Sequence, residues 1–179
     1  MIRGFRLAAA TLALVAAGCS RYAPAPDFTL PAQRGASWSL AAQHGKTVAL
    51  FFGFTHCEDT CPTTLAKLSK AIGNDRDAEV AFVTVDPQRD TPRAMNAYLA
   101  RFDGAPIVGL TGTPQQIASV ERAYHVWSQK IPGKRGRYDY DEAHIATVFF
   151  IDPNGRQRML ADQTDSVETL ASDVKTTLQ

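Results

Sequence analysis

The chain has 179 residues, of which 45% are hydrophobic and 21% are charged. These proportions are typical of one globular domain that is large enough to bury a core. The net charge is +1, and it becomes −1 if an N-terminal segment carrying Arg3 and Arg6 is removed. A nearly neutral domain has no electrostatic attraction for nucleic acid, so we expect no nucleic-acid partner.

The first eighteen residues have the pattern of an export signal. Two arginines precede an apolar stretch over 7–17, which is shorter than the ~20 residues of a membrane span. Small residues before Cys19 resemble a bacterial lipoprotein signal, although Ala16 stands where such motifs usually carry Leu. We therefore expect 1–18 to be a signal peptide and Cys19 to be acylated. The alternative is a plain secretory signal, with the cysteine incidental.

A lipid anchor would place the protein on a membrane, facing the periplasm. We favour the inner membrane, but Ser20 follows the cysteine where an Asp retains many lipoproteins there, so outer-membrane sorting is the alternative. Residues 19–26 contain two prolines and predict a short extended tether. One domain is expected over 27–179, because the sequence shows no internal repeat and no second linker.

Strands and helices alternate along this domain. The ranges 28–30 and 37–40 predict a small hairpin, and the apolar run 48–54 predicts a strand that is buried on both faces. Apolar residues at helical spacing follow Pro62, which suits the first turn of a helix. Further strands are expected at 80–85, 107–110, 147–151 and 157–160, and further helices beginning near 90, 113 and 166. This order predicts an α/β fold with a mixed sheet and chemistry at the carboxyl ends of its parallel strands.

Two thiols, Cys57 and Cys61, follow the first buried strand. If Cys19 is acylated, they are the remaining thiols of an exported chain in an oxidising compartment. A disulfide between them would close a very short loop and stabilise the fold little, so the pair indicates disulfide exchange or binding of a soft metal. The start of a helix favours thiolate, whereas Glu58 and Asp59 oppose it, so we do not expect extremely acidic thiols.

Three stretches make the chain resemble the Sco/SenC family, which has a thioredoxin-like fold. They are FFGFTHCEDTCPTTL (51–65), VTVDPQRDTP (83–92) and FIDPNG (150–155), and the likeness runs from about Pro26 to the C-terminus. The resemblance implies that Cys57, Cys61 and His144 are copper ligands and that the cysteines form the Cys57–Cys61 disulfide when oxidised. It also implies assembly of the copper centre of cytochrome c oxidase, whereas some members of the family act as thiol-disulfide reductases.

The four histidines are expected to have different roles. His144 precedes the strand at 147, where it can reach the thiols, and two thiolates with one imidazole suit Cu(I) and accept Cu(II). It departs from the family pattern, because alanine precedes it and isoleucine follows. His56 is expected to tune a thiol pKa or cap the helix rather than ligate. We expect His125 to be structural and His44 to be exposed.

Two further segments are candidates for supporting the site. The segment 86–92 leaves the second buried strand beside the thiols, and we favour a structural role in which Asp90 or Thr91 caps the next helix, over polar support for the site. The range 128–142 predicts a long charged loop ending near His144, either a mobile flap that delivers the histidine or a solvated insertion.

The leading hypothesis is a membrane-anchored copper metallochaperone. Its partners would be the copper-carrying subunit of cytochrome c oxidase and, further, other copper chaperones or thiol-disulfide proteins. The rival is a thiol-disulfide reductase, in which Cys57 attacks and Cys61 resolves the mixed disulfide. A thiol peroxidase is a weaker third hypothesis, because Glu58 and Asp59 oppose the strongly activated thiolate that it needs.

Overall fold

A five-stranded mixed sheet forms the centre of the computed structural model, which describes residues 21–132 and 140–178. The spatial order is β5 (Ile107–Leu110), β4 (Ala78–Thr84), β3 (Thr47–Gly53), β8 (Thr147–Ile151) and β9 (Gln157–Asp162). β3, β4 and β5 run parallel, whereas β8 and β9 are antiparallel. Every residue of β3 and β4 is buried, which explains their continuous apolar runs.

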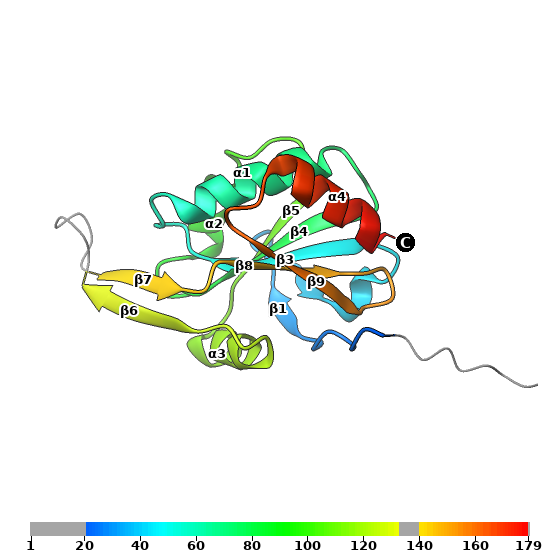
Figure 1. Cartoon of the computed structure of the whole chain (residues 1–179). Coiled ribbons are helices and arrows are strands. Elements are labelled where there is room, and N and C mark those ends of the chain that lie inside the picture. Colours follow the sequence, from blue (N-terminus) through cyan, green and yellow to red (C-terminus); the bar gives the residue numbers. More distant parts are fainter. Residues whose placement is uncertain (1–20, 133–139, 179) are drawn as a thin grey trace, which may run out of the picture.

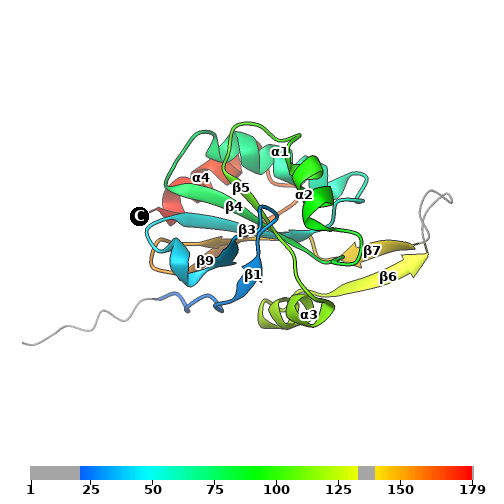
Figure 2. The ribbon, with the colours of Figure 1, turned by 180° about the vertical axis from the view of Figure 1, so that it is seen from behind.

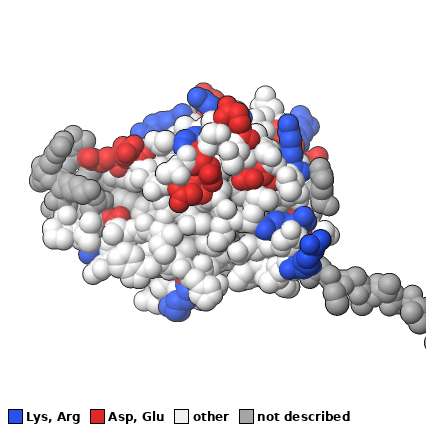
Figure 3. Space-filling view, in the orientation of Figure 1, with Lys and Arg blue, Asp and Glu red and all other residues white. Residues whose placement is uncertain are grey.

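Helices and a hairpin cover the two faces of this sheet (Figures 1 and 2). One face carries α1 (Thr60–Ile72), α2 (Pro92–Leu99) and α4 (Val167–Thr177), and the other carries α3 (Pro114–Ala123) with the hairpin of β1 (Thr29–Pro31) and β2 (Ser37–Ser39). The short 3₁₀ helix Ala41–Gln43 follows the hairpin. The acidic side chains in Figure 3 gather over α1 and α4, whereas the part towards α3 carries few charges.

Aromatic side chains fill the core on both faces of the sheet. On one face Phe82 packs between Phe51 and Tyr98, with ring centroids 6.0 and 5.9 Å away. On the other face Tyr124 packs against Phe149 at 5.3 Å. The α/β fold with a mixed sheet is confirmed, and so are the expected hairpin, strands and helices.

The prediction of a loop over 128–142 is wrong for the residues of this range that the structure describes, 128–132 and 140–142. The range contains β6 (Ser128–Pro132) and β7 (Tyr140–His144), which pair antiparallel as a ribbon extending from the body (Figure 1). Because this ribbon lies apart from the core, its strands need no alternating apolar face, and the sequence signal of a strand is missing. The residues between the two strands lie outside the described residues.

Chain packing begins before the expected domain boundary at residue 27. Ala25 donates a backbone hydrogen bond to Gly155, Gln157 donates one to Ala23, and Pro24 forms a β-bridge with Arg156. The described part of the expected tether is therefore fastened to the turn between β8 and β9. The expected signal peptide, 1–18, and Cys19 lie outside the described residues. None of the described helices has the length and apolarity needed to cross a bilayer.

Candidate functional site

The thiols lie where β3 passes into α1. Cys57 is half-buried in the turn before the helix, and Cys61 is fully buried in the first helical turn. The Cys61 backbone N–H donates to Cys57 Sγ at 3.3 Å, which brings the sulfurs to one side. A Cβ on Gly53, at the end of β3, would lie 2.8 Å from Cys61 Sγ. Glycine is therefore required there for the buried sulfur to approach the strand.

Their surroundings give the two thiols opposite acidities. The pKa of Cys57 is lowered to about 6, mainly by the Cys61 side-chain hydrogen bond and further by backbone N–H groups at the start of α1. The same hydrogen bond and burial raise the pKa of Cys61 well above its ordinary value. Glu58 and Asp59 are exposed, so these donors outweigh the acidic neighbours that the sequence analysis expected to oppose the thiolate. Cys57 is therefore the more acidic of the two thiols, and Cys61 is the one that stays protonated at neutral pH.

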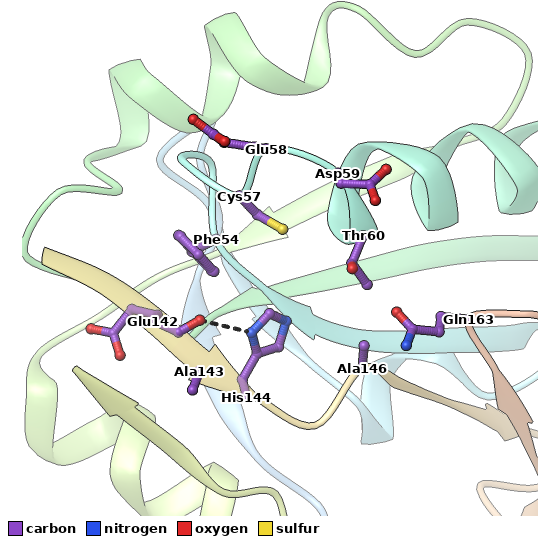
Figure 4. A pocket seen from close by; sticks show the side chains of 10 residues that line it. All are labelled: Phe54, Cys57, Glu58, Asp59, Thr60, Glu142, Ala143, His144, Ala146 and Gln163. Carbon is purple, nitrogen blue, oxygen red and sulfur yellow. Dashed lines mark hydrogen bonds between the residues drawn. The ribbon is translucent and has the colours of Figure 1, made fainter. Parts of the chain in front are cut away.

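His144 ends β7 and faces the thiols. Its Nε2 lies 3.6 Å from Cys61 Sγ, and its ring packs edge-on against Phe54 at 5.5 Å between centroids. Its Nδ1 lies 3.4 Å from the carbonyl oxygen of Glu142 (Figure 4). Because a carbonyl oxygen only accepts, this contact assigns the proton to Nδ1 and leaves the Nε2 lone pair directed at the sulfur.

This arrangement fits a soft metal ion, with one adjustment. Metal–sulfur and metal–nitrogen bonds of ~2.3 and ~2.0 Å separate two ligands of a tetrahedral ion by about 3.5 Å. The observed separation between Cys61 Sγ and His144 Nε2 is 3.6 Å. Within the described residues, however, no three His, Cys, Asp or Glu side chains are already gathered for one ion. A three-ligand site that includes Cys57 therefore requires the three side chains to come closer together.

A cleft of about 430 Å³ opens beside these groups. Figure 4 shows the side chains of Cys57 and His144 pointing towards the same space. The rim is formed by Glu58, Asp59 and Thr60 on one side and by Gln163 on another. A ligand or partner atom can thus approach the half-buried thiol, while Cys61 stays behind it.

Asp90 supports the turn that carries the thiols. Its buried carboxylate accepts hydrogen bonds from the Thr55 N–H at 3.0 Å, the Thr55 hydroxyl at 2.6 Å and the Thr84 hydroxyl at 2.6 Å. Thr91 caps α2, accepting from the N–H of Ala94. The expected capping role is confirmed for Thr91, whereas Asp90 instead ties the ends of β3 and β4 together.

A second group of contacts fastens the β6–β7 ribbon. Tyr140 donates a hydrogen bond to Asp86 at 2.9 Å, and Arg89 donates to the Tyr140 carbonyl at 2.9 Å. The Arg89 guanidinium also lies 3.8 Å from the centre of the Tyr140 ring and is hydrogen-bonded to Asp86. The segment after β4 therefore holds the strand that ends in His144, and sequence reasoning did not single out Arg89 or Tyr140.

The other histidines have different surroundings. His56 is half-buried, with Nδ1 3.1 Å from the Thr55 hydroxyl and 3.8 Å from Asp90, so it belongs to the supporting network. His44 is exposed, as expected. His125 follows α3 with an exposed ring and a φ of 54°, so its structural role is to end the helix in a left-handed conformation.

Comparisons with known proteins agree on one family. A family model described as SCO1/SenC matches residues 19–179. The mitochondrial SCO2 homolog of Bos taurus is 38% identical over 155 residues, which cover 79% of this chain and 57% of that protein. An SCO2-like protein of Rickettsia conorii is 34% identical over 134 residues, which cover 73% of this chain and 65% of that protein. The match thus spans less than two thirds of the length of these relatives.

Two solved structures share the fold over nearly their whole length. ScoI of Bradyrhizobium japonicum, with copper bound, superposes with a TM-score of 0.77 at 38% identity, covering 87% of this chain and 100% of that one. ScoI of Arabidopsis thaliana, also with copper bound, gives a TM-score of 0.79 at 31% identity, covering 87% and 98%. The fold is therefore thioredoxin-like, and the chain belongs to the SCO1/SenC family.

Proposed function

We propose that this protein binds copper through Cys57, Cys61 and His144 and passes it to an acceptor protein. The observation that carries the proposal is the 3.6 Å separation of Cys61 Sγ and His144 Nε2, with the acidic Cys57 thiol beside them. Thiolate and imidazole are the ligands that Cu(I) prefers, and they also hold Cu(II). The copper-bound relatives support the choice of metal.

The same geometry supports delivery rather than permanent storage. Three protein ligands leave a position on the metal free, and the cleft lets an acceptor side chain reach it. Copper is then a cargo that moves by ligand exchange. By the family resemblance, the acceptor is the copper-carrying subunit of cytochrome c oxidase, and acylation of Cys19 holds the protein at the same membrane.

The test is a Cu(I) titration of the reduced, purified full chain, with Cys19→Ser in every sample so that two thiols remain. We expect one tight equivalent, abolished by Cys57→Ser and by Cys61→Ser and weakened at least about tenfold by His144→Ala, since one ligand is lost. His125→Ala is the matched control, because that ring is exposed and away from the cleft. Binding that ignores the His144 substitution would contradict the proposed ligand set.

A second candidate function is reduction of a disulfide in the acceptor. The pKa of about 6 at Cys57, with the protonated Cys61 behind it, is the arrangement of an attacking and a resolving thiol. Cys57 thiolate would attack the acceptor disulfide, and Cys61 would release it as a dithiol while the Cys57–Cys61 disulfide forms. Because this step needs no imidazole, His144→Ala should leave the rate of reduction of a model disulfide unchanged while it weakens copper binding.

The contacts of Tyr140 predict that it positions His144. Tyr140→Phe removes the hydrogen bond to Asp86 and should lower the copper affinity by about three- to tenfold, since the ribbon loses one charge-assisted contact of about 1 kcal/mol. In the His144→Ala background the same change should have no effect, because the ligand that it positions is gone. A loss of equal size in both backgrounds would contradict the positioning role. The measurement is a double-mutant cycle on Cu(I) affinity.

A further inference from the structure

Among the residues that the structure describes, four large hydrophobic side chains are strongly exposed, and two of them line a single hollow. The exposed fractions are 39% for Tyr22, 53% for Trp127, 44% for Ile145 and 57% for Leu160. Ile145 and Leu160 line a hollow of about 420 Å³ between α3, β8, β9 and the chain that precedes β1, and Tyr22 and Trp127 adjoin other residues of its wall. We call these four side chains the apolar face. A monomeric soluble surface rarely gathers its exposed hydrophobic residues in this way.

Among the described residues, His125 is the one basic side chain in the lining of the hollow, and two arginines lie at its border, of which Arg158 is paired with Asp152 at 3.3 Å. The lining contains no Asp, Glu, Lys or Arg. At the border, Arg158 lies 4.3 Å from the centre of the Tyr22 ring, and Arg156 donates a hydrogen bond to the Tyr22 carbonyl at 3.0 Å. In Figure 3 the surface below α1 and α4 is mainly white, whereas the acidic groups of this view gather over α1 and α4.

The position of Tyr22 limits the distance between the apolar face and a membrane to which Cys19 is attached. Tyr22 is fixed to the body by the two arginines, so the described chain begins at the border of the apolar face. Cys19 stands three residues earlier, and three residues span at most about 11 Å. If Cys19 is acylated, the bilayer surface must therefore lie close to Tyr22 in every molecule.

We infer that the apolar face rests on the lipid bilayer. Trp and Tyr are the residues that favour the level of the lipid headgroups, aliphatic side chains between them enter the acyl boundary, and Arg156 and Arg158 can contact anionic headgroups. The inference rests on the proposed acylation of Cys19 and is independent of copper binding.

This orientation has a consequence for the site. His144 and Ile145 are adjacent in sequence but serve different surfaces, since the histidine lines the cleft beside the thiols and the isoleucine lines the hollow. The cleft lies at the start of α1 and the hollow at the end of α3, on opposite faces of the sheet, so contact of the apolar face with the bilayer would leave the cleft open to an acceptor.

The chain contains its own reporter for this contact. Of its two tryptophans, Trp127 belongs to the apolar face, whereas Trp38 is buried and its indole N–H donates to Glu79 at 3.1 Å. The acylated full-length protein is reconstituted into vesicles of phosphatidylcholine and phosphatidylglycerol with brominated acyl chains, which quench indole emission at the membrane. We expect loss of most of the Trp127 emission, with the remaining signal equal to that of Trp127→Phe.

Variants separate contact of the face from attachment by the anchor. Ile145→Glu combined with Leu160→Glu should restore Trp127 emission while the protein stays on the vesicles, and Lys70→Glu on α1 should change nothing. If Trp127 emission were not quenched in vesicle-bound wild-type protein, the inference would be overturned. The apolar face would then be a candidate surface for binding a protein partner. Mass spectrometry that finds Cys19 without an acyl group would overturn the inference too. A Cu(I) titration of the same samples reports separately on the proposed function and on folding of the double variant.

Discussion

Iodoacetamide at about pH 7 should alkylate Cys57 more than about tenfold faster than Cys61 in the reduced protein. With a pKa of about 6, most of Cys57 is thiolate, whereas Cys61, with a pKa well above 9, is almost all thiol. Because the Cys57 thiolate is less basic, it is intrinsically a weaker nucleophile, and this reduces the difference between the two rates. Burial of Cys61 then adds a barrier of access. Mass spectrometry after a timed quench measures the two rates.

The pH dependence of this reaction identifies its cause. The rate at Cys57 should rise with a midpoint near pH 6, because the thiolate is the reacting form. Cys61→Ala removes the first cause of the lowered pKa, the side-chain hydrogen bond, and should move the midpoint upwards. Cys61→Ser keeps a donor of similar size and should move it less. A midpoint that is the same in all three proteins would show that Cys61 does not set the acidity of Cys57.

The elements that carry the thiols could be predicted from sequence because each has a strong local signal. The run 48–54 is apolar throughout, since β3 is buried on both faces, and Pro62 marks the first turn of the helix that follows. The resemblance to the Sco/SenC family then pointed to His144, whose approach to Cys61 Sγ is seen in the structure. Its place at the end of a strand could not be read from the chain, because the ribbon is solvated and carries no apolar alternation.

The supporting network could be predicted only in outline. The segment 86–92 was a candidate for polar support, yet its sequence also fits a simple helix start, and Thr91 does cap α2. Asp90 differs from an ordinary helix cap because it is buried and accepts hydrogen bonds from Thr55 and Thr84. These contacts form only in the tertiary structure, so local sequence patterns do not predict them. The contacts of Tyr140 depend in the same way on a ribbon that local patterns do not predict.

Asp90→Ala should lower the free energy of unfolding by about 3 kcal/mol or more. The change removes the acceptor of three hydrogen bonds to a buried carboxylate and leaves the donors of Thr55 and Thr84 without it. Because Thr55 precedes the turn that carries Cys57, the variant should also lose the low midpoint of Cys57 alkylation. Urea unfolding measures the first effect. Asp75→Ala is the control, since that half-buried residue accepts one exposed hydrogen bond, from the Asp77 N–H within its own loop.

Asp90→Asn separates the contribution of the side chain's shape to protein stability from the contribution of its charge. Burial raises the pKa of Asp90 above its ordinary value of 3.8, so the folded protein holds this proton more tightly than the unfolded chain. The stability that this proton contributes is therefore fully present below about pH 3.8 and is lost as pH rises through the higher pKa of the folded state. An asparagine side chain does not titrate, so its contribution to stability does not change with pH. Its deficit relative to aspartate should therefore be larger near pH 4 than near pH 7, and a deficit that grows with pH would show that hydrogen bonds to the carboxylate outweigh its burial.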